Sequence, residues 1–300
     1  MAMPGPARRR ISLTALLPTA GLLPLVLWQI VFFVVPVALI VGLSFWRSKN
    51  YRLIPDFTFD NYAAIFARPA IWRALLLSLE TAAFVTVACA ILAYPVAYFI
   101  AKKAGRWRGL LLVAVIAPFW VSIVMRVAAW RLLLGERGVI NQAVMALGLT
   151  DEPLSFLLYS PVSTAIGLIY AYLPLYVLPL YAAISNIHDS WIDAAMDLNA
   201  SPTRTFFEVI LPLSAPGLVV GAVFCFVFGL GEFVTPALLG GTANMMLAEL
   251  IAQFVQSLVN WGMGGAAALV LLVVTLTLYA VQLKFFGAAG AEGRLHAFEL

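Results

Sequence analysis

Residues 189–217 read D-S-W-I-D-A-A-M-D-L-N-A-S-P-T-R-T-F-F-E-V-I-L-P-L-S-A-P-G. If the apolar runs of this chain span a membrane, this is the longest polar interruption between two of them on its side. Its residues indicate two short helices instead of a mobile loop. Ser190 is expected to cap the first helix, with Asp193 in the first turn, where a carboxylate faces the positive helix end. Asn199 is expected to end that helix, because Asn tolerates the left-handed backbone of a helix terminus.

The second helix of this segment is expected to begin at Ser201. Its hydroxyl can cap the helix, and Pro202 falls in the first turn, where a missing N–H costs nothing. Leu211-Pro212 is expected to close the helix and to lead into the next apolar run. We call residues 189–212 the helix pair. A folded helix pair between two apolar runs predicts a docking surface for another protein.

A helix lying on the membrane surface is the alternative for the helix pair, because apolar side chains supply enough area for it. These side chains are Trp191, Ile192, Phe206, Phe207 and Ile210. Acidic residues in the same segment argue against binding to anionic lipid. They are Asp189, Asp193, Asp197 and Glu208. We therefore expect the helix pair to contact a protein.

The composition is that of a polytopic membrane protein. The chain has 300 residues, of which 63% are hydrophobic and 11% charged, and its mean hydropathy is +1.00. Soluble domains carry roughly 25% charged residues. The net charge of +4 does not indicate nucleic-acid binding, because the basic residues are distributed by membrane side.

We expect an all-α fold with six transmembrane helices, in a single transmembrane domain that comprises residues 1–300. A span needs about 20 apolar residues. The run that follows Arg8–Arg10 continues to Trp46, too far for a cleaved signal peptide, so it is read as a retained first span. The expected spans are residues 22–45, 74–100, 110–134, 161–184, 213–238 and 261–286.

The distribution of Lys and Arg predicts the orientation. If the N-terminus is cytoplasmic, the inner segments hold ten basic residues: Arg8, Arg9, Arg10, Lys102, Lys103, Arg106, Arg108, Arg204, Lys284 and Arg294. The outer segments then hold six: Arg47, Lys49, Arg52, Arg68, Arg73 and Arg137. Basic residues favour cytoplasmic loops, so both termini and the helix pair are expected in the cytoplasm.

Catalytic machinery is absent from the sequence. No G-x-x-x-x-G-K-[ST] loop is present, so ATP is not expected to bind this chain through a P-loop. There is no H-E-x-x-H or G-x-S-x-G pattern and no cluster of metal-ligand residues. We expect no enzyme activity, no metal and no cofactor in this chain, so any energy source must come from a partner.

Ionisable residues inside the spans are the candidates for a substrate pathway, because burying a charge in a membrane is costly. Glu80, Glu232, Arg126 and Arg131 are such residues. One interpretation is structural: Arg126 pairs with a carboxylate and Arg131 reaches outward. The other is a cavity for a cationic solute, lined by Glu232, Trp120, Tyr170, Tyr172 and Tyr176, where carboxylate attraction and cation–π contact suit an alkylammonium group.

The helix pair resembles a signature of a known family. Asp193-Ala194-Ala195, Asn199-Ala200 and Ile210-Leu211-Pro212 match the spacing of the E-A-A-x-x-x-G-A…LP motif in permease subunits of type I ABC importers. Asp193 stands for the usual Glu, and Asn199 for the usual Gly. In that family this loop is the coupling helix, which docks on a cytoplasmic ATP-binding subunit. The resemblance implies that docking involves Ser190, Asp193, Ala194, Ala195, Asn199, Ala200, Leu211 and Pro212.

Four further segments resemble the permeases of polyamine (putrescine/spermidine) ABC importers. They are Arg126-Val-Ala-Ala-Trp130, Gly138-Val-Ile-Asn141, Tyr170-Ala-Tyr-Leu-Pro174 and Gly231–Gly241. The resemblance implies polyamine uptake by alternating access in a bacterial inner membrane. It also implies a second permease in a heterodimer, two copies of a cytoplasmic ATP-binding subunit that hold ATP and Mg, and an extracytoplasmic substrate-binding protein. The chain is also expected to contact membrane lipid. No nucleic-acid partner is expected.

Other functions stay open at this point. The same machine could carry an amino acid or another small organic solute. A secondary transporter driven by an ion gradient would favour midplane ion sites and internal repeats, which are not evident in the sequence. A membrane-embedded enzyme would need a catalytic constellation, which the sequence does not show.

Overall fold

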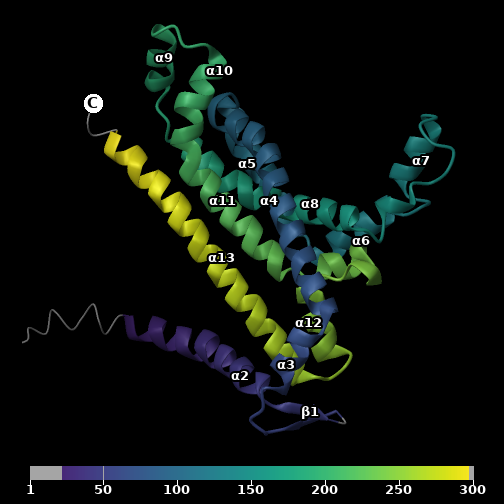
Figure 1. Cartoon of the computed structure of the whole chain (residues 1–300). Coiled ribbons are helices and arrows are strands. Elements are labelled where there is room, and N and C mark those ends of the chain that lie inside the picture. Colours follow the sequence, from purple (N-terminus) through teal and green to yellow (C-terminus); the bar gives the residue numbers. More distant parts are fainter. Residues whose placement is uncertain (1–21, 50, 297–300) are drawn as a thin grey trace, which may run out of the picture.

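The computed structural model describes residues 22–49 and 51–296 (Figure 1). In this part of the chain, five helices are long and apolar enough to cross a membrane. The number becomes six if the bent pair Gly105–Trp120 and Ile123–Ala146 counts as one span. The all-α, multi-span class is thereby confirmed. The predicted basic cluster Arg8–Arg10 lies outside the described residues.

The elements follow one another with short connections. In chain order, they are a π-helical turn (Ile30–Val34), α2 (Val35–Ser44), β1 (Arg47–Lys49), β2 (Arg52–Ile54), α3 (Asp60–Ala67), α4 (Pro69–Lys102), a 3-10 turn (Gly105–Trp107), α5 (Arg108–Ile116), a 3-10 turn (Ala117–Trp120), α6 (Ile123–Leu134), α7 (Val139–Ala146), a 3-10 turn (Ser155–Leu157), α8 (Pro161–Ser185), α9 (Asp189–Asp197), α10 (Pro202–Thr205), a π-helical turn (Phe206–Ile210), α11 (Leu211–Gly231), a π-helical turn (Pro236–Gly240), a 3-10 turn (Thr242–Asn244), α12 (Leu247–Gln256) and α13 (Trp261–His296).

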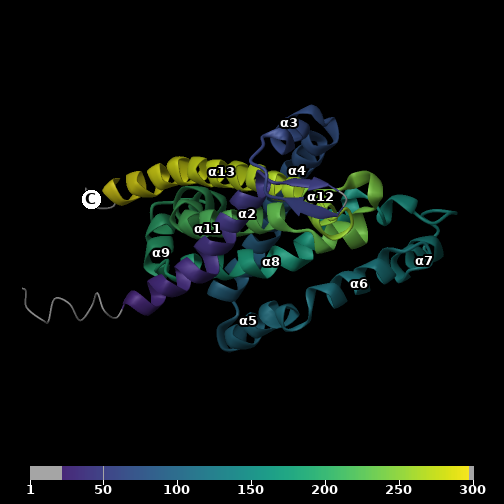
Figure 2. The ribbon, with the colours of Figure 1, turned by 90° about the horizontal axis from the view of Figure 1, so that it is seen from below.

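The centre of the molecule is formed by α4, α8 and α11, each of which packs against the other two (Figures 1 and 2). Small residues let the helices approach closely, as is common where membrane helices meet. Gly217 and Gly221 of α11 lie directly against α8: a Cβ at Gly221 would be 2.6 Å from a ring carbon of Tyr176. The Tyr176 side chain is 2% exposed and its hydroxyl donates to the Leu218 carbonyl at 3.0 Å.

Two π-helical turns each end two residues before a proline, at Pro36 and Pro212. A proline lacks an N–H and its ring clashes with the carbonyl four residues earlier, so a wider turn accommodates it within a helix. Leu211-Pro212 therefore does not close the second helix of the helix pair, contrary to the sequence prediction. Instead, the helix continues from Pro202 to Gly231 as one candidate span.

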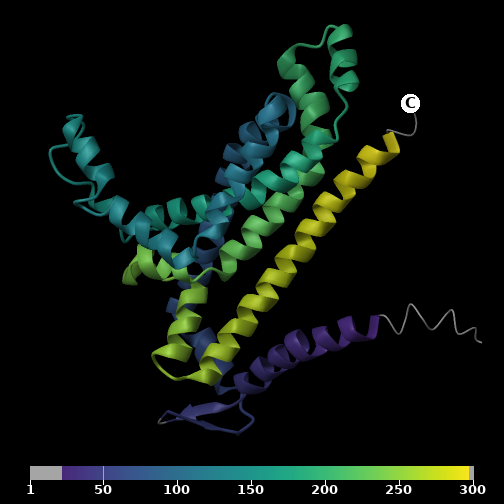
Figure 3. The ribbon, with the colours of Figure 1, turned by 180° about the vertical axis from the view of Figure 1, so that it is seen from behind.

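Two expected spans differ from the structure. Residues 110–134 do not form one straight helix, because the chain turns by 92° between α5 and α6, after a 3-10 turn that contains Pro118. Residues 213–238 are interrupted after Gly231, where Glu232 adopts an extended backbone with ψ 127°. Beyond the first break, α6 and α7 project away from the central helices (Figures 1 and 3).

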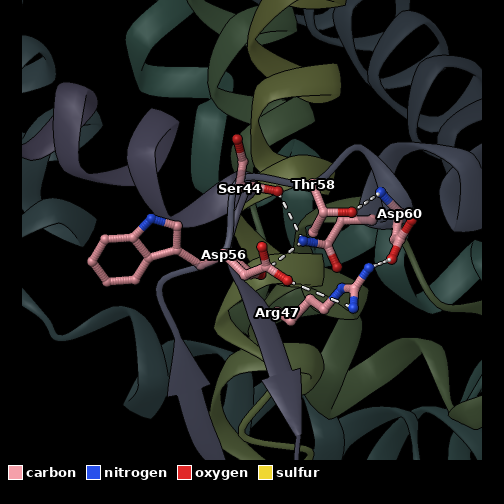
Figure 4. Close-up of polar contacts among 7 residues, drawn as sticks. Ser44, Arg47, Asp56, Thr58 and Asp60 are labelled. Atoms are coloured by element: carbon pink, nitrogen blue, oxygen red, sulfur yellow. Dashed lines mark hydrogen bonds and ion pairs between the residues drawn. The ribbon is translucent and has the colours of Figure 1, made fainter.

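The opposite end of the molecule from α9 carries α3, α12 and a two-stranded antiparallel hairpin of β1 and β2 (Figures 1 and 3). Figure 4 shows how polar contacts fix this end: Arg47 contacts Asp56 at 3.6 Å and Asp60 at 2.6 Å. The Asn61 amide donates to the Ser44 carbonyl at 2.8 Å, which joins the end of α2 to α3. The first span is thus anchored at one end.

Replacing Gly217 by Ala should destabilise the packing of α11 on α8. The added Cβ would lie 2.6 Å from the Ala183 Cβ and 2.7 Å from the Pro179 carbonyl oxygen. Overpacking of this kind costs about 1–3 kcal/mol. Unfolding in detergent micelles measures the loss, with Gly231→Ala as the matched control in the same helix, because a Cβ there meets nothing within 4 Å. Equal stability of the two variants would contradict this packing.

Candidate functional site

The first helix of the helix pair is held at its start by a lysine from α4. Lys102 Nζ donates to the Ile187 carbonyl at 2.5 Å and to Asp189 Oδ1 at 2.6 Å. This hydrogen bond and the positive charge of Lys102 hold the pKa of Asp189 below its usual range. Ser190 is not the cap that the sequence predicted: α9 begins at Asp189, and His188 occupies the cap position without a side-chain hydrogen bond.

The end of α9 is a Schellman motif, in which two amides beyond the helix bond back to its last carbonyls. Asn199 has a φ of +62°, the left-handed conformation expected from the sequence. Its N–H donates to the Met196 carbonyl at 2.9 Å, and the Ala200 N–H donates to the Ala195 carbonyl at 3.1 Å. Asn199 therefore fills the place in this motif that glycine most often occupies.

The second helix starts as predicted. Ser201 Oγ accepts a hydrogen bond from the Arg204 N–H at 3.3 Å, and Pro202 occupies the first turn. Arg204 Nε in turn contacts both carboxylate oxygens of Glu208, at 2.9 Å and 2.8 Å. The two helices are thus folded units joined by a turn of fixed geometry.

The tip of the helix pair presents both acidic and apolar side chains to its surroundings. Asp193 and Ala194 are exposed, whereas Ala195, Ala200 and Leu211 are half-buried. The exposed fraction of the tip's apolar side chains reaches 84% at Leu198. Other exposed residues of this surface are Ser190, Trp191, Met196, Asn199, Phe207 and Pro212. An acidic surface that also carries exposed apolar side chains can bind a protein partner.

Arg108 attaches the other end of the basic segment 102–108 to α8. Its Nη2 donates to Ser185 Oγ at 2.8 Å, and its guanidinium carbon lies 4.7 Å from the centre of the Tyr181 ring. From the sequence alone, Lys102 and Arg108 indicated only the orientation in the membrane. Lys102 lies two residues beyond the predicted span 74–100, and Arg108 lies two residues before the predicted span 110–134. These positions at facing ends of consecutive spans are the signal that could have suggested the contacts.

Glu232 occupies the break between α11 and the helical segment that follows. Its Oε1 accepts hydrogen bonds from the N–H groups of Val234 at 2.8 Å and Thr235 at 3.2 Å, and so caps that segment. Its Oε2 accepts from the Tyr172 hydroxyl at 2.9 Å. Of the predicted pathway residues, the structure joins Glu232 and Tyr172 directly, and both oxygens of the carboxylate are occupied.

Arg126 makes no ion pair within the described part of the chain. Its Nε and Nη1 atoms are buried without a hydrogen-bond partner, and its guanidinium carbon lies 5.5 Å from the centre of the Phe119 ring. Arg131 donates from Nη2 to the Tyr159 hydroxyl at 2.6 Å. The expected pairing of Arg126 with Glu80 or Glu232 is therefore absent from this conformation.

The remaining pathway candidates are dispersed. Tyr176 belongs to the packed core, Trp120 is 75% exposed, and the Tyr170 ring lies 5.6 Å from that of Trp130. Glu80 lies at an apolar groove of about 390 Å³ between α4 and α8. Residues 22–49 and 51–296 hold no group of three or more His, Cys, Asp or Glu that could bind a metal ion.

Known proteins resemble this chain in sequence and in structure. No protein-family model matches the chain. The chain is 34% identical over 248 residues to the spermidine/putrescine transport system permease protein PotB of Salmonella typhimurium strain SL1344, covering 82% of this chain and 86% of the relative.

Solved structures with the same fold are those of bacterial ABC transporters. One is a transporter involved in the import of the acidic polysaccharide alginate, with a TM-score of 0.73 at 19% sequence identity. The match covers 92% of this chain and 96% of the transporter's chain. Another is an alginate transporter in complex with a periplasmic protein that binds an alginate pentasaccharide, with a TM-score of 0.68 at 20% sequence identity. This match covers 90% of this chain and 93% of the transporter's chain. These likenesses establish the fold.

Replacing Asn199 by Ala should loosen the end of α9, whereas Asn199→Gly should preserve it. The left-handed backbone costs Ala roughly 1–2 kcal/mol, whereas Gly has no Cβ and the short polar side chain of Asn can compensate by local hydrogen bonding. Hydrogen exchange of the backbone amides at positions 199 and 200 should then become about 5–30 times faster in Asn199→Ala than in the wild type. Asn186→Ala is the control, because Asn186 has a φ of −82°. Equal exchange in Asn199→Ala and the wild type would argue against the motif.

Proposed function

This chain belongs to the family of spermidine/putrescine transport permeases, and on that premise we propose that it is the polyamine-carrying permease subunit of an ATP-driven ABC importer. It is a multi-pass inner-membrane protein with the fold of an ABC importer permease. The observation that carries the proposal is the identity to a spermidine/putrescine permease, because it extends over most of the chain. Transport would proceed by alternating access of the helices to the two membrane sides.

The helix pair is proposed as the docking surface for a cytoplasmic ATP-binding subunit. ATP and Mg would be bound, and the ATP hydrolysed, on two copies of that subunit, since this sequence has no P-loop. The surface would include Asp193 and Ala194, which are exposed, and the turn at Asn199. Fixed geometry supports this role, because a surface that transmits motion must move as a unit.

The proposed orientation places the helix pair and both termini in the cytoplasm. The basic segment 102–108 and α9 lie at the same end of the molecule, and the hairpin of β1 and β2 lies near the other (Figure 1). The hairpin end would then face an extracytoplasmic substrate-binding protein. A second permease would complete a heterodimer beside the exposed apolar faces of the spans.

Glu232 is proposed as the anionic group that a cationic solute meets on its way through the permease. Its carboxylate is held at a helix break by two amides and Tyr172. Oε1 already accepts two hydrogen bonds, but Oε2 accepts only one, so Oε2 retains a lone pair for an ammonium group. Attraction between opposite charges is strong where water is scarce.

Uptake of labelled putrescine and spermidine tests the proposed function. Cells that lack the gene for this chain should lose saturable uptake of both, and the wild-type gene should restore it. Amino acids serve as competing solutes. Unchanged polyamine uptake together with lost amino-acid uptake would preserve the ABC permease and overturn the polyamine substrate. Uptake that withstands ATP depletion but not an uncoupler would instead indicate an ion-coupled transporter.

The same assay separates the charge of Glu232 from its capping role. Glu232→Gln retains a side-chain oxygen that can accept from Val234 and Thr235, but it removes the negative charge. We expect at least tenfold lower polyamine uptake at normal protein levels, since one lost charge–charge contact in a dry site readily exceeds about 1.4 kcal/mol. Tyr176→Phe is the control, because it removes a buried hydroxyl of α8 that bonds to Leu218 and not to Glu232. Normal uptake by Glu232→Gln would remove Glu232 from the pathway.

A further inference from the structure

Lys102 is a nearly buried cation in contact with two acceptors of the chain segment that leads into α9. The exposed fraction of its side chain is 11%, whereas that of Asp189 is 78%. One acceptor is the Ile187 carbonyl, which lies just beyond the end of α8, and the other is the Asp189 carboxylate in the first turn of α9. A lysine that served only to bias the membrane orientation would have no need of such burial, because that effect requires charge alone.

A second contact attaches the other end of the helix pair to the same helix. The Tyr94 hydroxyl of α4 lies 2.8 Å from Ser214 Oγ, two residues beyond the helix pair. The Tyr94 ring also packs edge-on against Phe206 at 5.2 Å between ring centres. The helix pair is therefore joined to α4 both before α9 and after α10.

The helix α4 is long enough to carry movement from this end into the membrane. Its 34 residues extend about 50 Å, compared with about 30 Å for the hydrocarbon core of a bilayer. Farther along, Ala82 of α4 packs against Phe226 and Leu230 of α11. Leu230 lies two residues before the break at Glu232, so α4 touches both the helix pair and the neighbourhood of that break.

We propose that Lys102 is a positioning residue that makes the helix pair and α4 move as one body. When the docked partner shifts the helix pair, the contacts of Lys102 transfer that displacement to the end of α4. Without them, the segment 186–189 could bend and absorb the motion. This inference rests on the proposed function, because it assigns a role to Lys102 in coupling ATP hydrolysis to transport.

Lys103 provides a matched control for Lys102. It is the next residue, it carries the same charge on the same side of the membrane, and it is exposed. In the described part of the chain, Lys103 takes part in no side-chain hydrogen bond or ion pair. Replacing either lysine by Met removes the same charge from the same segment, but only one replacement breaks the contacts.

The experiment measures putrescine uptake and ATP hydrolysis by the complete transporter in proteoliposomes. Lys102→Met should lower the ratio of transported putrescine to hydrolysed ATP by roughly tenfold, as expected from the loss of a charged hydrogen bond. Lys103→Met should leave the ratio unchanged, and Lys102→Arg should restore most of it, because Arg can reach both acceptors. Adding Asp189→Asn to Lys102→Met should cause little further loss, because the two residues share one interaction.

Equal ratios for Lys102→Met and Lys103→Met would overturn the proposal. If Lys102→Met does not assemble, Lys102→Gln decides in its place, because Gln keeps a donor but is too short to hold both acceptors; a wild-type ratio for that variant overturns the proposal equally. Wild-type proteoliposomes that do not transport putrescine would refute the proposed substrate. In that case, the same comparison of variants is made by ATP hydrolysis alone, where Lys102→Met should differ from Lys103→Met.

Discussion

The constraint on which the structure depends is that backbone polar groups inside a membrane must be paired within the protein. Three interruptions of long helices in the described residues meet this requirement locally. The π-helical turns before Pro36 and Pro212 accommodate a residue without an N–H. At the break after Gly231, the Glu232 carboxylate accepts from the amides that open the next segment. In these three places, a side chain or a wider helical turn compensates for the backbone hydrogen bonds that the regular helix loses.

The helix pair and the central helices of the membrane core form one connected structure. The continuous helix from Pro202 to Gly231 joins the second helix of the pair to the core through the backbone. The side chains of Lys102 and Tyr94 join the pair to α4. Two of the three central helices therefore lead from the proposed docking surface toward Glu232, which is the geometry that coupled transport needs.

The sequence predicts features that depend on local chemistry. Apolar runs predicted the helical class, and Asn199 and Ser201 predicted a helix end and a helix start that the structure confirms. Contacts between residues that are far apart in the chain could not be predicted from the sequence. Ser190 was expected as a cap, but the Lys102–Asp189 contact accompanies a helix that starts at Asp189. Charge alone could not distinguish Lys102 from Lys103, because only the folded chain buries one of them.

Chemical cross-linking of the assembled transporter tests the proposed docking of the helix pair. Ala194 is exposed on α9, and Tyr51, 79% exposed, lies at the far hairpin, so each is replaced by Cys in turn. Cys89 and Cys225 are buried and are replaced by Ala in the background. We expect a thiol–amine cross-linker to join position 194, but not position 51, to the proposed ATP-binding subunit. A cross-link from position 51 with none from position 194 would contradict this docking.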